Sequence, residues 1–112
     1  MSVYADQLSG FSRTIGQCGV RSTIVAQNVY DDPDFFAGYS ALPRSVQGLD
    51  GAPEWPSLQA LLPDLAGREV VDLGCGFGWF SRWAASAGAT DVLGIDLSHN
   101  MLARARQETA DP

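Results

Sequence analysis

Two segments rich in glycine and aspartate contain the residues best suited to bind a ligand. They read Val70-Val-Asp-Leu-Gly-Cys-Gly-Phe-Gly78 and Leu93-Gly-Ile-Asp-Leu-Ser98. Glycine adopts positive φ angles and lets a ligand approach the backbone closely. A helix that begins behind such a loop offers unpaired N–H groups and the positive end of its dipole. The first segment therefore predicts a loop that holds a ligand through its backbone.

Asp96 adds a side chain that suits a ribose. It lies 22 residues after Gly74, the separation that a crossover between neighbouring strands produces. A carboxylate at the end of the second strand can accept hydrogen bonds from both hydroxyls of a ribose. Together the two segments predict an adenosine-containing ligand across the C-terminal edge of a parallel sheet.

The spacing of the glycines distinguishes two classes of such ligands. Dinucleotide sites use the pattern GxGxxG. Here Gly74, Gly76 and Gly78 form GxGxG, and Trp79 occupies the next position. The carboxylate of Asp72 would repel a pyrophosphate, but it suits a ligand with an ammonium and a sulfonium. A nicotinamide dinucleotide site and a plain tight turn remain as less favoured alternatives.

The elements around these segments alternate between strand and helix from residue 68 onward. We expect short strands over residues 70–73 and 92–96 and a helix between them, which ends near Gly88. Ser98 is placed to cap a last helix with Met101, Leu102 and Ala105 on its inner face. Two strands separated by such a helix predict a right-handed βαβ unit and a parallel sheet.

The segment 28–67 is expected to be helical. Asp32 can cap a helix that starts at Pro33 and has an aromatic face, and Leu42–Pro43 ends it. Residues 44–56 are expected to form a loop. A short helix starting at Pro56 or Ser57 should carry Leu58, Leu61 and Leu62 on one face. Residues 1–27 show no sustained hydrophobic period, so we expect a disordered extension there.

Composition excludes several other functions. The chain has 112 residues and a net charge of −6, and all 7 of its basic residues are arginine. Without lysine it can build neither a P-loop nor a Schiff base. The acidic balance disfavours nucleic acid as a partner.

The two cysteines and the single histidine favour no metal or disulfide framework. We therefore expect free thiols in a cytoplasmic protein. We find no signal peptide pattern and no apolar run long enough to span a membrane.

Residues 71–81 and 94–105, Val71-Asp-Leu-Gly-Cys-Gly-Phe-Gly-Trp-Phe-Ser and Gly94-Ile-Asp-Leu-Ser-His-Asn-Met-Leu-Ala-Arg-Ala, resemble a known family. They are similar to the first two motifs of class I S-adenosylmethionine-dependent methyltransferases, in particular the type 11 group, whose members methylate small molecules. The resemblance covers roughly residues 68–109, extends loosely over 28–67 as a segment that caps the cofactor, and leaves out 1–27. It implies an α/β fold of the Rossmann-like class I methyltransferase type, with a helical segment followed by β-α-β-α.

The resemblance also implies roles for the loop residues. Gly74 and Gly76 would line the methionine part of S-adenosylmethionine, and Gly78 would let the next helix pack closely. Asp72 would lie near the amino group of the cofactor. Cys75 belongs to the same binding loop, as a small residue in a crowded turn and not as a nucleophile.

Further roles follow for residues outside the loop. Asp96 would hold the ribose hydroxyls, while Leu97 and Met101 would lie near the adenine. Tyr39 and Arg44, from the capping segment, would reach the methionine carboxylate. No catalytic residue is assigned, because a base is needed only if the acceptor must lose a proton.

The family's sheet has about seven strands, and the sequence predicts only the first two. We therefore expect residues 68–112 to be the N-terminal half of a methyltransferase domain within a longer enzyme, inactive alone. An inert or purely cofactor-binding module is the alternative. In this arrangement residues 69–73 would form an unpaired apolar edge, and we expect poor solubility or dependence on a partner.

Overall fold

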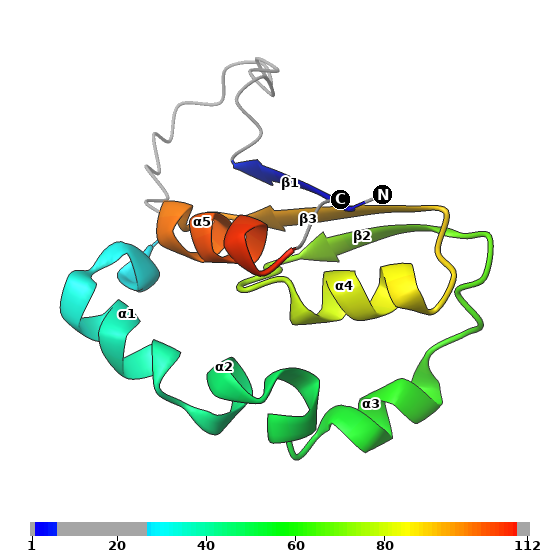
Figure 1. The fold of residues 1–112 in the computed structure, drawn as a ribbon, viewed down its shortest axis with the longest axis horizontal. Helices are drawn as coiled ribbons and strands as arrows, with labels where there is room; N and C mark the ends of the chain where they lie inside the picture. Colours follow the sequence, from blue (N-terminus) through cyan, green and yellow to red (C-terminus); the bar gives the residue numbers. More distant parts are fainter. Residues whose placement is uncertain (1, 7–26, 110–112) are drawn as a thin grey trace, which may run out of the picture.

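A computed structural model describes residues 2–6 and 27–109 (Figure 1). Its centre is a parallel sheet of three strands in the order β1-β3-β2. The strands are β1 (Ser2–Asp6), β2 (Glu69–Leu73) and β3 (Asp91–Asp96). The helices are η1 (Val29–Asp31), α1 (Pro33–Ser40), α2 (Pro43–Val46), η2 (Gly48–Gly51), α3 (Trp55–Leu61), α4 (Trp79–Ser86) and α5 (His99–Glu108).

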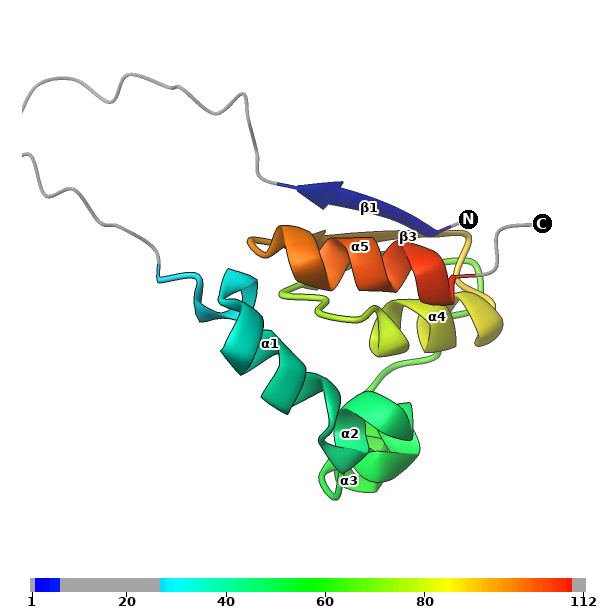
Figure 2. The ribbon, with the colours of Figure 1, turned by 60° about the vertical axis from the view of Figure 1, so that its left-hand side comes forward.

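The βαβ unit predicted from the sequence is present. β2 and β3 run parallel with Val70 beside Val92, and α4 connects them. Helices α4 and α5 cover the same face of the sheet (Figures 1 and 2). Between α4 and the sheet, the core contains Ala84 of α4 and Val92 of β3, which are 0% and 2% exposed. The α/β class expected from the sequence is therefore confirmed.

Helix α5 forms where the Ser98 cap and the spacing of the apolar residues predict it. The Ser98 hydroxyl accepts a hydrogen bond from the Met101 amide at 3.1 Å, which caps the first turn. Met101, Leu102 and Ala105 are buried on its inner face. This cap places the start of α5 directly beside the end of β3, where the candidate site lies.

The edge of the sheet at β2 is open within the described part of the chain. β2 pairs with β3 on one side, and Val71 and Leu73 remain 59% and 78% exposed. The sequence predicts an apolar edge at this strand, and the structure confirms it. Unpaired strand edges of this kind are templates for pairing with another strand.

The expectation of no regular structure at the N-terminus is wrong for Ser2–Asp6. These residues form β1, which pairs with β3 in register from Ser2 beside Val92 to Asp6 beside Asp96. The strand uses the otherwise free edge of β3, a distant partner that local periodicity does not show. Residues 7–26, which complete the expected extension and include Cys18, lie outside the described residues.

The capping segment differs from expectation in its second half. Residues 44–56 are not simply a loop, because Pro43 suits the first position of a new helix and α2 and η2 form there. In α3 the leucines face solvent, since Leu58 and Leu61 are 46% and 83% exposed. The buried anchor is Trp55, which meets the Trp83 ring edge-on at 4.8 Å.

Candidate cofactor-binding site

A cavity of about 900 Å³ lies at the carboxyl ends of β2 and β3. All three strands point toward this end of the sheet, and η1 and α1 lie beside it (Figure 1). Ligands of open parallel sheets bind at this edge. The cavity is lined by Gln27, Asn28, Tyr30, Tyr39, Leu73, Gly74, Gly76, Ile95, Asp96, Leu97 and Met101. Six residues predicted to bind the cofactor thus meet in one place: Tyr39, Gly74, Gly76, Asp96, Leu97 and Met101.

The glycine loop leaves space on its cavity side. Gly74, Gly76 and Gly78 have φ angles of 76°, 54° and 76°, a left-handed region that favours glycine. A β-carbon at Gly74 or Gly76 would meet no atom within 4 Å. At Gly78 it would lie 2.5 Å from the hydroxyl oxygen of Tyr4. The first two glycines therefore open the cavity, and the third allows close packing behind it.

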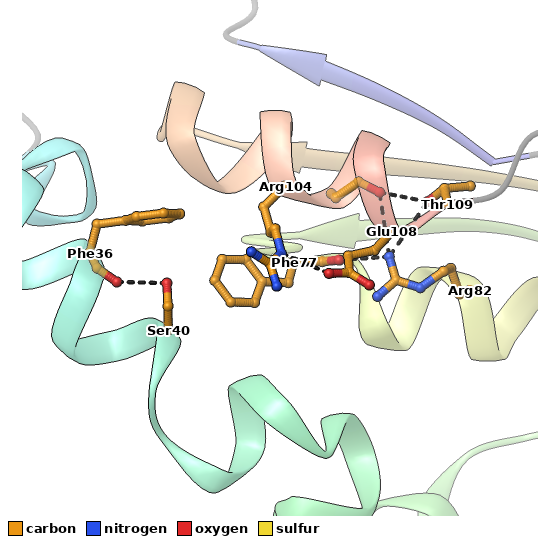
Figure 3. Close-up of polar contacts among 8 residues, drawn as sticks. Phe36, Ser40, Phe77, Arg82, Arg104, Glu108 and Thr109 are labelled. Atoms are coloured by element: carbon orange, nitrogen blue, oxygen red, sulfur yellow. Dashed lines mark hydrogen bonds and ion pairs between the residues drawn. The ribbon is translucent and has the colours of Figure 1, made fainter.

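Phe77 anchors this loop in the protein interior. It is 5% exposed, and the rings of Phe36 and Tyr39 meet it edge-on at 5.8 and 5.7 Å. Arg82 donates a hydrogen bond to its carbonyl oxygen at 2.7 Å, and the Arg104 guanidinium lies 5.7 Å from its ring centroid (Figure 3). The loop is thereby held to α1, α4 and α5.

Asp96 is fixed at the floor of the cavity by two backbone amides. Its Oδ2 accepts a hydrogen bond from the Gly76 amide at 2.8 Å, and its Oδ1 accepts one from the Ser98 amide at 2.9 Å. A carboxylate offers about four lone-pair positions, so both oxygens can still accept ligand hydroxyls. The arrangement holds both carboxylate oxygens in place at the cavity.

Asp72, in β2, and Cys75, in the loop, do not line the cavity. The Ser81 hydroxyl donates a hydrogen bond to Asp72 Oδ2 at 2.7 Å. Burial raises the pKa of the Asp72 carboxyl above its ordinary value, although the bond from Ser81 opposes this shift. Burial likewise raises the pKa of the Cys75 thiol to about 12, so this free cysteine is not suited to nucleophilic chemistry.

The capping segment supplies an aromatic wall. The rings of Tyr30 and Tyr39 meet edge-on at 5.2 Å, and both line the cavity. Burial raises the pKa of the Tyr39 hydroxyl, which therefore stays protonated as a potential hydrogen-bond donor. Arg44 is not among the residues that line the cavity, and its guanidinium pairs with Glu54 at 3.0 Å. Its predicted contact with the cofactor stays a prediction.

Sequence reasoning missed Asn28, Tyr30 and Asp31. Asn28 and Tyr30 line the cavity, and Asp31 accepts hydrogen bonds from the start of α5. Tyr30 lies three residues before Pro33, where the predicted helix starts, and its aromatic ring is the one local signal. The contact of Asp31 with α5 joins positions far apart in the chain, and no local pattern indicates it.

Comparison with known proteins finds similarity to methyltransferases over part of the chain. Residues 70–112 match the model of a methyltransferase domain. A crystal structure of an S-adenosylmethionine dependent methyltransferase from Mesorhizobium loti is 63% identical, with a TM-score of 0.56 over 58% of this chain and 30% of that chain. Residues 70–112 are thus similar to a methyltransferase domain, and this solved structure is of the S-adenosylmethionine-dependent kind. A putative S-adenosylmethionine dependent methyltransferase from Listeria monocytogenes is 52% identical, with a TM-score of 0.50 over 53% of this chain and 28% of that chain.

The curated proteins that this chain resembles have different names. The malonyl-[acyl-carrier protein] O-methyltransferase of Pectobacterium atrosepticum is 49% identical over 47% of this chain and 21% of its own length. The tRNA U34 carboxymethyltransferase of Marinobacter nauticus is 46% identical over 38% of this chain and 13% of its own length. A Haemophilus influenzae protein is 38% identical over 72% of this chain. The chain spans 32% of that protein, so it matches a third or less of these relatives.

Proposed function

We propose that this chain binds S-adenosylmethionine in the cavity between the glycine loop and Tyr39. We further propose that it forms the N-terminal part of a longer methyltransferase that acts on a small molecule. The observation that carries the cofactor assignment is the position of Asp96, held at the cavity floor by the amides of Gly76 and Ser98. The space over Gly74 and Gly76 supports it, because a ligand can contact the backbone there.

Each part of the cofactor has a partner in the proposed site. The two open glycines would face the methionine part, and Asp96 would hold the ribose hydroxyls. Leu97 and Met101 supply apolar surface for the adenine, and Tyr39 can donate a hydrogen bond to the carboxylate of the methionine. Asp72, near the end of β2, would favour the ammonium and the sulfonium of the ligand through its negative charge.

The role proposed for these residues is to position the bound cofactor. When bound, S-adenosylmethionine supplies an electrophilic methyl group on a sulfonium. Because the leaving group is good, the main tasks of the protein are to orient the donor and to shape the field around it. The Phe77 anchor and the Asp96 bonds provide this orientation, since both fix the loop before a ligand arrives. No described residue is assigned as a base.

A small molecule is the acceptor that the chain's own charge favours. The net charge of −6 and the absence of lysine disfavour a tRNA, whose phosphates need clustered positive charge. Relatives named for tRNA and for a malonyl-[acyl-carrier protein] show that names alone do not select the acceptor. We therefore base this choice on the electrostatics of the chain.

The cofactor assignment is tested by following backbone amides in NMR spectra while S-adenosylmethionine is added. We expect the amides of Gly74, Gly76 and Leu97 to shift and saturate. NAD⁺, added separately, should leave them in place, because the GxGxG loop does not fit a pyrophosphate. Saturable shifts with NAD⁺ and none with S-adenosylmethionine would overturn the proposal in favour of a dinucleotide site.

A matched pair of variants locates the ribose contact. Asp96→Asn should weaken binding about tenfold, the size expected for loss of a hydrogen bond to a charged group. Asp91→Asn removes the same charge from the exposed opposite end of β3 and should leave affinity unchanged. Equal affinities for both variants would show that Asp96 does not hold the ribose. Methyl transfer itself is tested in a longer form that includes the rest of the family's domain.

A further inference from the structure

Asp31 contacts the N-terminus of α5 from a distant part of the sequence. Its Oδ1 accepts a hydrogen bond from the Ser98 hydroxyl at 2.6 Å, across 67 residues of chain. The amides of His99 and Asn100 donate to its two carboxylate oxygens at 3.3 and 3.1 Å. A carboxylate at this end of a helix is favoured by the helix dipole. Asp31 thus joins the capping segment to the last helix.

This contact continues to the proposed ribose site. Ser98 is fully buried, and its hydroxyl binds Asp31 while its amide donates to Asp96 Oδ1. The second oxygen of Asp96 holds the Gly76 amide. A single path of hydrogen bonds therefore runs from Asp31 through Ser98 and Asp96 to the glycine loop.

Asn28 reinforces the same connection from the cavity side. Its side-chain amide donates to Asp31 Oδ2 at 2.7 Å and to the Leu97 carbonyl at 3.2 Å. The Asn100 side chain donates to the Tyr30 carbonyl at 3.5 Å. Because Asn28, Tyr30 and Leu97 all line the cavity, these bonds set the distance between the aromatic wall and the loop after β3.

Helix α5 has an N-cap without Asp31. Ser98 already caps α5 by accepting the Met101 amide. The hydrogen bond from Ser98, the largest contribution, lowers the pKa of the Asp31 carboxyl, which shows that the structure favours its charged form. The extra carboxylate orients the Ser98 hydroxyl and connects two walls of one cavity.

We propose that Asp31 is a positioning residue for cofactor binding, which holds the capping segment and the 96–98 loop in the geometry that lets Asp96 receive the ribose. This inference rests on the proposed function for its ligand. The structural part of the inference, that Asp31 orders the 96–98 loop, is independent of the proposed function. The two parts are therefore tested by separate measurements.

The first measurement uses no ligand. Asp31→Asn keeps one acceptor oxygen and loses the charge, Asp31→Ala loses both, and Asp34→Asn removes a charge from the exposed first turn of α1 as the control. We expect the NMR signals of the Gly76 and Ser98 amides to shift in both Asp31 variants and to stay in place in the control. Unchanged amide signals in a folded Asp31→Ala chain would overturn the proposal, whether or not the chain binds S-adenosylmethionine.

The second measurement is a double-mutant cycle on S-adenosylmethionine affinity. Asp31→Ala should weaken binding about tenfold and Asp31→Asn by less, as expected for hydrogen bonds to a charged group. In an Asp96→Asn background the Asp31→Ala change should have little further effect, because the residues act through one path. Strictly additive losses would show that Asp31 acts only on general stability and would contradict the positioning role.

The results separate the two proposals. If the unsubstituted chain does not bind S-adenosylmethionine, the proposed function fails, and the ligand-free spectra still decide whether Asp31 orders the loop. If the unsubstituted chain binds and Asp31→Ala binds equally well, the positioning role fails and the proposed function stands. Recovery of affinity in Asp31→Asn relative to Asp31→Ala supports the hydrogen-bonded path through Ser98.

Discussion

The amide of Gly76 donates a hydrogen bond to Asp96 Oδ2 at 2.8 Å. This bond connects the loop after β2 to the end of β3 directly, 20 residues apart in the chain. The two features that the sequence offers as ligand-binding elements are therefore one structural unit. A change in the conformation of either residue must be transmitted to the other.

The first prediction concerns the space over Gly76. Gly76→Ala should destabilise the fold by about 1 kcal/mol, because alanine at a positive φ is strained. Its β-carbon meets no protein atom within 4 Å and would occupy ligand space. We therefore also expect a loss of S-adenosylmethionine affinity, measured by NMR titration alongside urea unfolding.

Gly67→Ala is the matched control for this prediction. Gly67 has a φ of 72° and equally open surroundings, but it does not line the cavity. It should show the same loss of stability without a loss of affinity. If both variants lose affinity equally, the effect comes from general destabilisation, and the assignment of Gly76 to the ligand is refuted.

The second prediction concerns the half-buried carboxyl group of Asp72. Burial raises the pKa of this carboxyl in the folded state above its unfolded value. The folded protein therefore favours the protonated carboxyl, and this contribution to folding stability is fully present below the pKa that Asp72 has in the unfolded chain. The contribution is lost as the pH rises through the pKa that Asp72 has in the folded protein. At neutral pH the ionised group opposes folding. Asp72→Asn, which can still accept the hydrogen bond from Ser81, should therefore stabilise the fold at pH 7 and have little effect near pH 3.

Urea unfolding at both pH values measures this difference. Asp91→Asn, an exposed carboxylate on β3, serves as the control and should change stability little at either pH. The same Asp72→Asn chain should bind S-adenosylmethionine more weakly, since the positive ligand loses a nearby negative charge. A variant that is less stable at pH 7 would show that the Ser81 bond outweighs the burial of the charge.

The region from β2 to α5 was predictable because local signals determine it. Ser98 and the spacing of Met101 and Leu102 fix both the start and the buried face of α5 within a few residues. The glycine loop follows in the same way, since its positive φ angles require glycine. Gly74, Gly76 and Asp96, which line the cavity, could therefore be predicted from the sequence.

The remaining features depend on contacts between distant residues. Ser2–Asp6 forms a strand only because the edge of β3 offers a partner. Asp31 meets Ser98 across 67 residues. The guanidinium of Arg44 pairs with Glu54, ten residues further along the chain. Composition and period do not encode any of these three pairings.

The third prediction concerns the reactivity of Cys75. Burial raises the pKa of its thiol to about 12. At pH 8 roughly one thiol in ten thousand is then ionised, compared with about one in four for an ordinary cysteine with a pKa near 8.5. In a Cys18→Ser chain, an aromatic disulfide reagent at pH 8 should react slowly with the folded protein and rapidly in urea. Rapid reaction of the folded chain would show an accessible or acidic thiol and would contradict this environment.

The last prediction concerns the open edge at β2. Val71 is 59% exposed on a strand that has a partner on one side only within the described part of the chain. An apolar, unpaired edge favours association with another strand, and charged residues on an edge strand suppress it. We expect the chain to self-associate as its concentration rises, and Val71→Lys to shift it toward the monomer in sedimentation velocity experiments. Leu61→Lys places the same charge on α3 at a side chain that is 83% exposed and outside the sheet. It should leave the association unchanged, and an equal reduction by both variants would assign the effect to net charge instead of the edge of β2.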